Sequence, residues 1–183
     1  MMPHWNWVRS GRGGGLAPSR AGAPFFILFL GLGCGSQPDS PGPSNDTADL
    51  EALVGEWVGM WNSYDLDQVS RLFLHDSRLT YFSSEREGVI QGMEALLDHH
   101  RGFGFVPGGE EKGTRLWVDG LRVDLLDDAA VLTGIWYFET NPGSTEDPQQ
   151  GPVTIVCHRT GEGWRFVHMN FSEYLPSDSI PIP

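Results

Sequence analysis

Apolar residues recur at three- and four-residue steps in the first patterned stretch of the chain, which starts near Asp49. The repeating positions are Leu53, Trp57, Met60, Trp61 and Tyr64. This spacing places one apolar stripe on an α-helix, which buries that stripe against a core. We therefore predict a helix over residues 49–64, with Thr47 or Asp49 as its N-cap.

Two further helices are predicted before the middle of the chain. Asp67 can cap a short helix, whose inner side carries Val69, Leu72 and Phe73. A short strand over residues 79–83 follows, and residues 93–100 are predicted as the third helix. A glycine-rich loop, residues 102–113, then separates these helices from the remainder.

The second half of the sequence predicts four strands, over residues 116–126, 130–140, 153–159 and 164–174. Asp127-Asp128 forms one turn, a polar loop with two prolines forms the next, and Thr-Gly-Glu-Gly forms the last. The strand over residues 130–140 is apolar on both faces, so helices are expected to cover one face and a partner subunit the other. Three helices followed by antiparallel strands give an α+β fold with the helices on one face of the sheet.

The first 33 residues follow a different pattern. Three arginines and no acidic residue precede a short apolar run over residues 25–32, and Gly33 stands directly before Cys34. The run is shorter than the roughly 20 apolar residues that a membrane-spanning helix needs. A basic region, a short apolar core and a small residue before the cut are typical of a secretory signal, so we predict a signal peptide over residues 1–33.

Gly33-Cys34 also resembles the bacterial lipobox, whose cysteine is acylated and becomes the new N-terminus. Gly31 stands where a leucine is usual, three positions before the cysteine. Residues 35–47 are rich in Pro, Gly and Ser, which predicts a flexible tether over residues 34–48. The expected location is the cell envelope, with lipidated Cys34 in the membrane. The alternative is a plain signal peptide and a periplasmic or secreted protein.

Charge narrows the range of partners. Residues 1–33 hold three of the 12 basic residues and none of the 24 acidic ones, so the exported part carries nine against 24, a formal charge of −15. Such a charge argues against binding to nucleic acid, and against binding of anionic lipid by the domain surface. If Cys34 is acylated, Cys157 has no disulfide partner and the fold depends on its apolar core.

Four segments follow one another in a recognisable order. They are Asp65-Leu-Asp67 after the Trp-rich helix, Gly92-Met-Glu-Ala-Leu, Leu126-Asp-Asp-Ala-Ala-Val, and the final Gly163-Trp-Arg-Phe-Val-His-Met-Asn-Phe-Ser172. Their order resembles the SnoaL-like branch of the nuclear transport factor 2-like superfamily. The resemblance places one domain over residues 49–176, with a tail over residues 177–183.

This resemblance implies a curved, mostly antiparallel sheet wrapped on a long helix, a cone-shaped pocket and commonly a homodimer. Relatives include isomerases, cyclases, dehydratases and proteins that only bind ligands, so the fold does not decide the function. Relatives tend to carry two histidines, one residue apart, in the last strand. The second of these is Asn170 in this chain.

Candidate chemistry centres on the last strand. His168, Asn170 and Ser172 share one side of it, because side chains alternate with period 2. If that side faces the cone, His168 can act as acid or base and Asn170 can orient a carbonyl. The alternative is that both residues pair with each other or with backbone elsewhere. The aromatic candidates for the pocket wall, for which a place in the core alone is the alternative, are Trp57, Trp61, Tyr64, Tyr81 and Trp136.

Neither a metal nor a cofactor is predicted. His99 and His100 are adjacent on a helix, so they point about 100° apart and do not readily share one ion. Three functions therefore remain open. The first is a tethered domain that binds a small apolar or amphipathic molecule. The second is a lyase, isomerase or cyclase that uses His168, and the third is a dimeric interaction module of the cell envelope.

Overall fold

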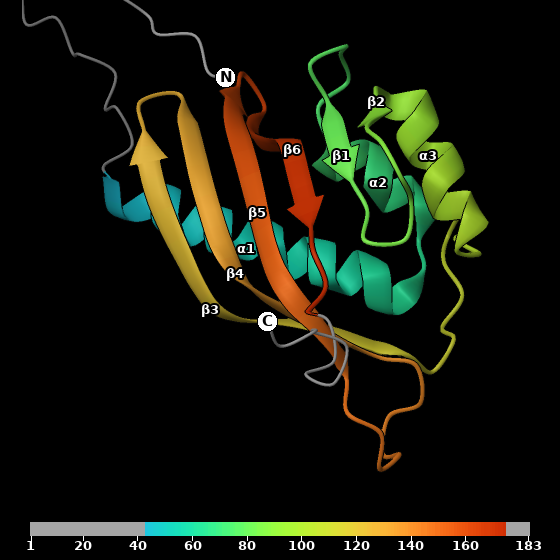
Figure 1. Cartoon of the computed structure of the whole chain (residues 1–183). Coiled ribbons are helices and arrows are strands. Elements are labelled where there is room, and N and C mark those ends of the chain that lie inside the picture. Colours follow the sequence, from blue (N-terminus) through green and yellow to red (C-terminus); the bar gives the residue numbers. More distant parts are fainter. Residues whose placement is uncertain (1–42, 175–183) are drawn as a thin grey trace, which may run out of the picture. The chain divides into compact units, whose positions relative to one another are not determined.

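The computed structural model describes residues 43–174 of the 183-residue chain (Figure 1). Its helices are α1 (Pro43–Ser63), α2 (Leu66–Leu72) and α3 (Met93–Gly102), and two short strands, β1 (Thr80–Phe82) and β2 (Ile90–Gln91), lie between α2 and α3. Four long strands follow, β3 (Arg115–Leu126), β4 (Ala129–Glu139), β5 (Gln149–Thr160) and β6 (Gly163–Phe171). The predicted α+β class is confirmed. The predicted signal peptide, Cys34 and the predicted tail lie outside the described residues.

The six strands form one sheet in the order β2-β1-β6-β5-β4-β3. Every neighbouring pair is antiparallel except β1 and β6, which run parallel. The long strands curve, and α1 passes across one face of them (Figure 1). Buried side chains of α1 and of the strands form a single core, which includes Leu50, Met60, Leu132, Ile155 and Phe166. Within residues 43–174 no helix is long and apolar enough to cross a membrane.

The first helix begins at Pro43, within the segment predicted to be a tether. Asp46 in its first turn is only 8% exposed and forms an ion pair with Arg159 of β5. The Arg159 guanidinium also lies 4.3 Å from the centre of the Trp164 ring. The ion pair joins residues more than 100 positions apart, so local composition does not reveal it. Thr47 and Asp49 lie inside the helix and do not cap it.

The second helix is capped by Asp65, not by Asp67 as predicted. The Asp65 carboxylate accepts a hydrogen bond from the backbone N–H of Asp67 at 3.0 Å, and another from the Gln68 side chain at 3.0 Å. Before it, Tyr64 adopts a φ of 52°, which turns the chain sharply between α1 and α2. Asp65 therefore has a local structural role.

One extra residue in β6 decides which side chains face the core. Phe166 pairs with Cys157 of β5 and His168 pairs with Val156, so Val167 has no partner position. This β-bulge interrupts the period-2 alternation. Beyond it, Met169 and Phe171 are buried, and the strand ends at Phe171 instead of Tyr174.

Candidate functional site

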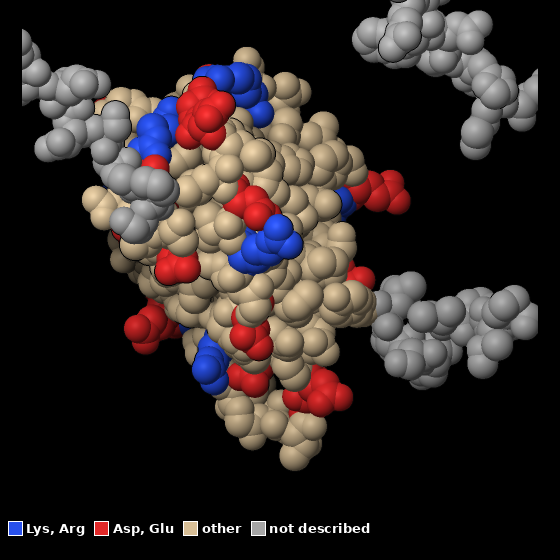
Figure 2. Space-filling view, turned by 90° about the vertical axis from the view of Figure 1, so that its left-hand side faces the viewer, with Lys and Arg blue, Asp and Glu red and all other residues tan. Residues whose placement is uncertain are grey.

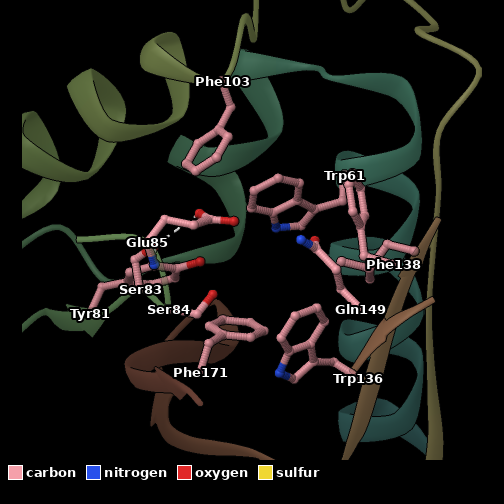
Figure 3. Close-up of a pocket in the computed structure, with 11 residues that line it drawn as sticks. Trp61, Tyr81, Ser83, Ser84, Glu85, Phe103, Trp136, Phe138, Gln149 and Phe171 are labelled. Atoms are coloured by element: carbon pink, nitrogen blue, oxygen red, sulfur yellow. Dashed lines mark hydrogen bonds between the residues drawn. The ribbon is translucent and has the colours of Figure 1, made fainter. Parts of the chain in front are cut away.

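A pocket opens between α1, the loop that joins β1 to β2, the end of α3 and the long strands (Figure 3). Six of its lining residues are aromatic, namely Trp61, Tyr81, Phe103, Trp136, Phe138 and Phe171. The others are Leu116, Ser83, Ser84, Glu85 and Gln149. The cavity volume is about 60 Å³, well below the roughly 300–1,000 Å³ of pockets for drug-sized ligands. It therefore suits a small molecule or the head of a larger one.

The aromatic walls hold one another in place. Ring centres lie 5.5 Å apart for Trp61 and Phe103, 5.6 Å apart for Tyr81 and Phe171, and 6.0 Å apart for Trp136 and Phe171. Tilted and edge-to-face pairs at these distances are favourable beyond the apolar area that they bury. The walls are consequently formed by rings that also pack against their neighbours.

Two indole groups in the pocket differ in their hydrogen bonding. Trp136 donates its Nε1–H to the carbonyl oxygen of Ser172 at 2.9 Å. Trp61 Nε1 is buried and has no hydrogen-bond partner among the described residues. Figure 3 shows this nitrogen directed into the pocket, beside the Gln149 amide. A buried donor without a partner carries a free-energy cost, and an acceptor atom on a ligand would relieve it.

Glu85 supplies the acid of the pocket. The residue belongs to the exposed β1–β2 loop, but its carboxyl group points inward, toward Trp61 (Figure 3). Burial raises the pKa of this carboxyl group, Glu173 raises it further, and a 3.3 Å hydrogen bond from Ser83 opposes both effects. Burial, together with the charge of Glu85, also raises the pKa of Tyr81. The phenol therefore stays protonated at neutral pH.

A second hollow shares Glu85 and Phe103 with the pocket. It has a volume of about 420 Å³, and Arg86 and His99 also line it. Burial, with a smaller contribution from Arg86, lowers the pKa of His99 to about 4. His100 faces the core, where burial lowers its pKa to about 4 as well. Both imidazoles are thus neutral at pH 7, and no group of three or more potential metal ligands occurs within residues 43–174.

The predicted aromatic residues divide into two groups. Trp61, Tyr81 and Trp136 line the pocket. Trp57 and Tyr64 do not, which corrects their assignment as ligand-binding residues. Trp57 is fully buried, with its ring 5.4 Å from that of Phe171, and the Tyr64 hydroxyl accepts a hydrogen bond from Thr114 at 3.0 Å. Both belong to the buried core of the domain.

His168 and Asn170 do not line the pocket, so the condition on which their suggested roles depended, that their side of the strand faces it, is not met. The bulge at Val167 and the burial of Met169 and Phe171 leave both residues on the opposite side of the sheet. His168 Nδ1 lies 2.8 Å from the hydroxyl oxygen of Thr80 in β1, and burial lowers the pKa of His168. The polar side of the last strand was identified correctly, but it is the side away from the helices.

The polar lining of the pocket was missed by sequence reasoning. Ser84 and Glu85 occur in a polar stretch that resembles a solvent-exposed loop, and Gln149 follows a proline-containing loop. No local pattern distinguishes these residues from other surface side chains. Phe138 and Phe171 occur in predicted strands, and their apolar character indicated that they are buried. It did not indicate that they line a pocket.

Charged side chains are dispersed over the surface that Figure 2 presents. Acidic side chains occur singly or beside basic ones, and wide uncharged areas lie between them (Figure 2). Several basic residues are paired with nearby acids, among them Arg78 with Asp76 and Arg122 with Asp124. No basic stripe suited to a phosphate backbone is seen on this face.

Comparison with known proteins gives a family match over most of the domain. The model of the SnoaL-like domain matches residues 43–170. No curated protein matches the chain significantly. Among solved structures, a nuclear transport factor 2-like superfamily protein from Salmonella enterica has a TM-score of 0.60 and 17% identity. That alignment covers 74% of this chain and 96% of the other.

Two further structures support the same fold. A putative dehydratase of the nuclear transport factor 2-like family from Streptomyces avermitilis has a TM-score of 0.61 and 16% identity, covering 74% of this chain and all of the other. A nuclear transport factor 2-like protein from Pseudomonas putida has a TM-score of 0.62 and 14% identity. That alignment covers 75% of this chain and 92% of the other. At these identities the likeness establishes the fold alone.

Proposed function

The chain belongs to the family of SnoaL-like domains, and from that premise we propose that its pocket binds a small, mainly apolar molecule with one polar group. The observation that carries the proposal is the buried Trp61 N–H, which has no partner among residues 43–174 and points into an aromatic cavity. Glu85 and Gln149 reach the same space. Aromatic walls with a few convergent polar groups are typical of small-molecule sites.

Phenol is a suitable first probe, because its ring matches the walls and its oxygen can accept from Trp61. We expect saturable binding of phenol in a calorimetric titration. The substitution Trp61→Phe keeps an aromatic ring but removes the donor, and it should weaken binding by roughly 2- to 10-fold, as expected for one hydrogen bond. The matched control is Trp117→Phe, since Trp117 stacks on Tyr137 at 5.0 Å on the other face of the sheet.

Equal effects of Trp61→Phe and Trp117→Phe on phenol affinity would contradict the proposed site. So would unchanged affinity in Trp61→Phe. A loss of folding in either variant is recognised from its thermal unfolding curve, and Trp61→Tyr then replaces Trp61→Phe in the comparison.

A second candidate is an enzyme that transfers protons, of the isomerase or lyase type. The observation that favours it is the inward carboxyl of Glu85, whose pKa burial raises, opposite the Trp61 N–H. Glu85 would accept a proton from a carbon next to a carbonyl, while Trp61 donates to the carbonyl oxygen as negative charge develops. The acid–base role predicted for His168 thereby passes to Glu85, which lies inside the pocket.

Hydrogen–deuterium exchange of cyclohexanone in D₂O provides a test of this second candidate. An enzyme of this type would accelerate exchange at the carbons next to the carbonyl, and Glu85→Gln would abolish the acceleration. Glu87→Gln, a change of the same kind in the same exposed loop, should leave it unaltered. Exchange no faster than in buffer would favour simple binding.

We also propose that the domain is exported, anchored through lipidated Cys34 and paired as a homodimer. The signal and lipobox patterns support the first two features. For the dimer, the support is the sheet face that α1 does not cover, which carries the Trp117–Tyr137 stack and, further along β4, Ile135 and Val131. Apolar and aromatic side chains are enriched where subunits meet.

A further inference from the structure

We infer that the pocket is built for a small organic cation, an amine or a quaternary ammonium that also carries an oxygen acceptor. This inference rests on the proposed binding function and adds the charge of the ligand. Three features of the pocket support it, namely its charge, its rings and the inward direction of Glu85.

All fixed charge at the pocket is negative. Among the described residues that line it, Glu85 is the one charged side chain. Glu173, which follows β6, lies near enough to raise the pKa of Glu85 by its charge. Arg86 and His99 line the adjoining hollow instead, and His99 is neutral at pH 7 because its pKa is about 4. A carboxylate or phosphate ligand would meet a like charge and no counter-ion.

The walls offer six aromatic rings, among them the indoles of Trp61 and Trp136 (Figure 3). The negative face of an aromatic ring attracts a cation within about 6 Å of its centre, and tryptophan does so best. A cavity of about 60 Å³ is matched to a compact head group. Cages of aromatic side chains are a recurrent means by which proteins bind quaternary ammonium groups.

The inward position of Glu85 separates a cationic ligand from a neutral one. A neutral apolar ligand needs only the aromatic rings for binding. An inward carboxylate adds nothing to that binding and has a free-energy cost, the same desolvation that raises the pKa of Glu85. A cation beside Glu85 offsets that cost through direct attraction. The Trp61 N–H, which no described residue accepts, is then left for an oxygen of the same ligand.

Three compounds with nearly the same shape test the charge. Choline is cationic, 3,3-dimethylbutan-1-ol is its neutral counterpart, and 3,3-dimethylbutanoate is anionic. We expect calorimetric titration of the protein to give the tightest binding for choline, about tenfold tighter than for the alcohol, and none for the anion. Glu85→Gln should reduce the preference for choline over the alcohol by about fivefold or more. Glu87→Gln, in the same exposed loop, should preserve it.

The outcomes distinguish this inference from the binding function on which it rests. If the alcohol binds as tightly as choline, or the preference survives Glu85→Gln, the cationic ligand is excluded while the pocket remains a binding site. If phenol binds but all three compounds fail, the cationic ligand is likewise excluded. If phenol also fails, the proposed binding function itself is wrong. Should Glu85→Gln fail to fold, Glu85→Asp, which withdraws the charge from the rings, takes its place with the same expected loss.

Discussion

At the scale of single residues, burial changes the chemistry of side chains that look ordinary in the sequence. His99 and His100 are neighbours on α3, yet burial lowers the pKa of each to about 4. His100 keeps one hydrogen bond, between Nδ1 and the Leu96 carbonyl oxygen at 2.9 Å. Both histidines therefore stay neutral at pH 5, where an ordinary histidine is protonated.

The lowered pKa values predict a loss of stability in mild acid. The ordinary pKa of histidine is about 6.5, so between pH 6.5 and 4 the unfolded chain binds more protons than the folded domain. The stabilisation is complete above pH 6.5 and is lost as the pH falls toward 4. We expect the Tm of the domain, measured on the full-length protein, to decrease as the pH is lowered through this window. The Tm of the His100→Phe variant, which lacks this titratable group, should decrease less steeply as the pH falls.

The matched control for this prediction is His75→Phe, because His75 is exposed. Differential scanning calorimetry at half-unit pH steps makes the measurement. The same slope of Tm against pH in His100→Phe and in the unaltered protein would contradict the assignment of acid sensitivity to this buried histidine.

At the scale of elements, the strands are positioned by close contacts between distant segments. The backbone after β6 crosses the start of β5, where the N–H of Ser172 donates to the Pro152 carbonyl at 3.1 Å. Gly151 permits this crossing, because a Cβ atom there would lie 1.9 Å from the Ser172 carbonyl oxygen. The same oxygen accepts the hydrogen bond from Trp136 in the pocket wall.

Gly151→Ala therefore tests how the crossing supports the pocket. We expect it to lower the free energy of unfolding by about 1–3 kcal/mol, the range for overpacked sites. It should also weaken phenol binding, since Trp136 loses its acceptor. Gly161→Ala is the control, because a Cβ atom at Gly161 meets nothing within 4 Å. Chemical denaturation measures both variants, and equal stabilities would contradict the expected clash.

At the scale of the whole molecule, the side of the sheet opposite α1 raises the question of a partner. The polar His168 and Asn170 share this side with Thr80 and Phe82, and β4 adds Val131 and Ile135. The sequence predicted that both faces of β4 are covered. The helices cover one face, and a second copy of the chain is our proposal for the other.

A charge placed in the middle of this side should prevent pairing. We expect the unaltered protein to sediment as a dimer and Ile135→Arg to sediment as a monomer at the same concentration, because an unpaired charge is costly in an apolar interface. Val89→Arg changes an exposed apolar residue of the β1–β2 loop and should remain dimeric. A monomeric unaltered protein at high concentration would refute the homodimer.

The membrane anchor is tested on the full chain. Expressed in a bacterial host, the protein should incorporate labelled palmitate and fractionate with membranes. Cys34→Ser should abolish both properties. Cys157→Ser provides the control, because Cys157 is buried in β5, where burial raises the pKa of its thiol to about 12. Unchanged labelling in Cys34→Ser would contradict lipidation at this position.

The sequence by itself determined the elements and their order, except for the two-residue strand β2, which it did not predict. Helical periodicity located α1, which carries Trp57 and Trp61 on one stripe, and alternation located the strands. These patterns depend on near neighbours in the chain, so they can be read locally. The sequence also gave the family resemblance that the match over residues 43–170 confirms.

Tertiary structure alone decided the site. Which side of β6 faces the helices depends on the unpaired Val167, and the length of α1 depends on the contact of Asp46 with Arg159. Glu85 reaches the pocket because its loop lies opposite Trp61 (Figure 3). Each of these outcomes requires residues far apart in sequence to meet. The family resemblance therefore implied a pocket, while only the packing of distant segments chose the side chains that line it.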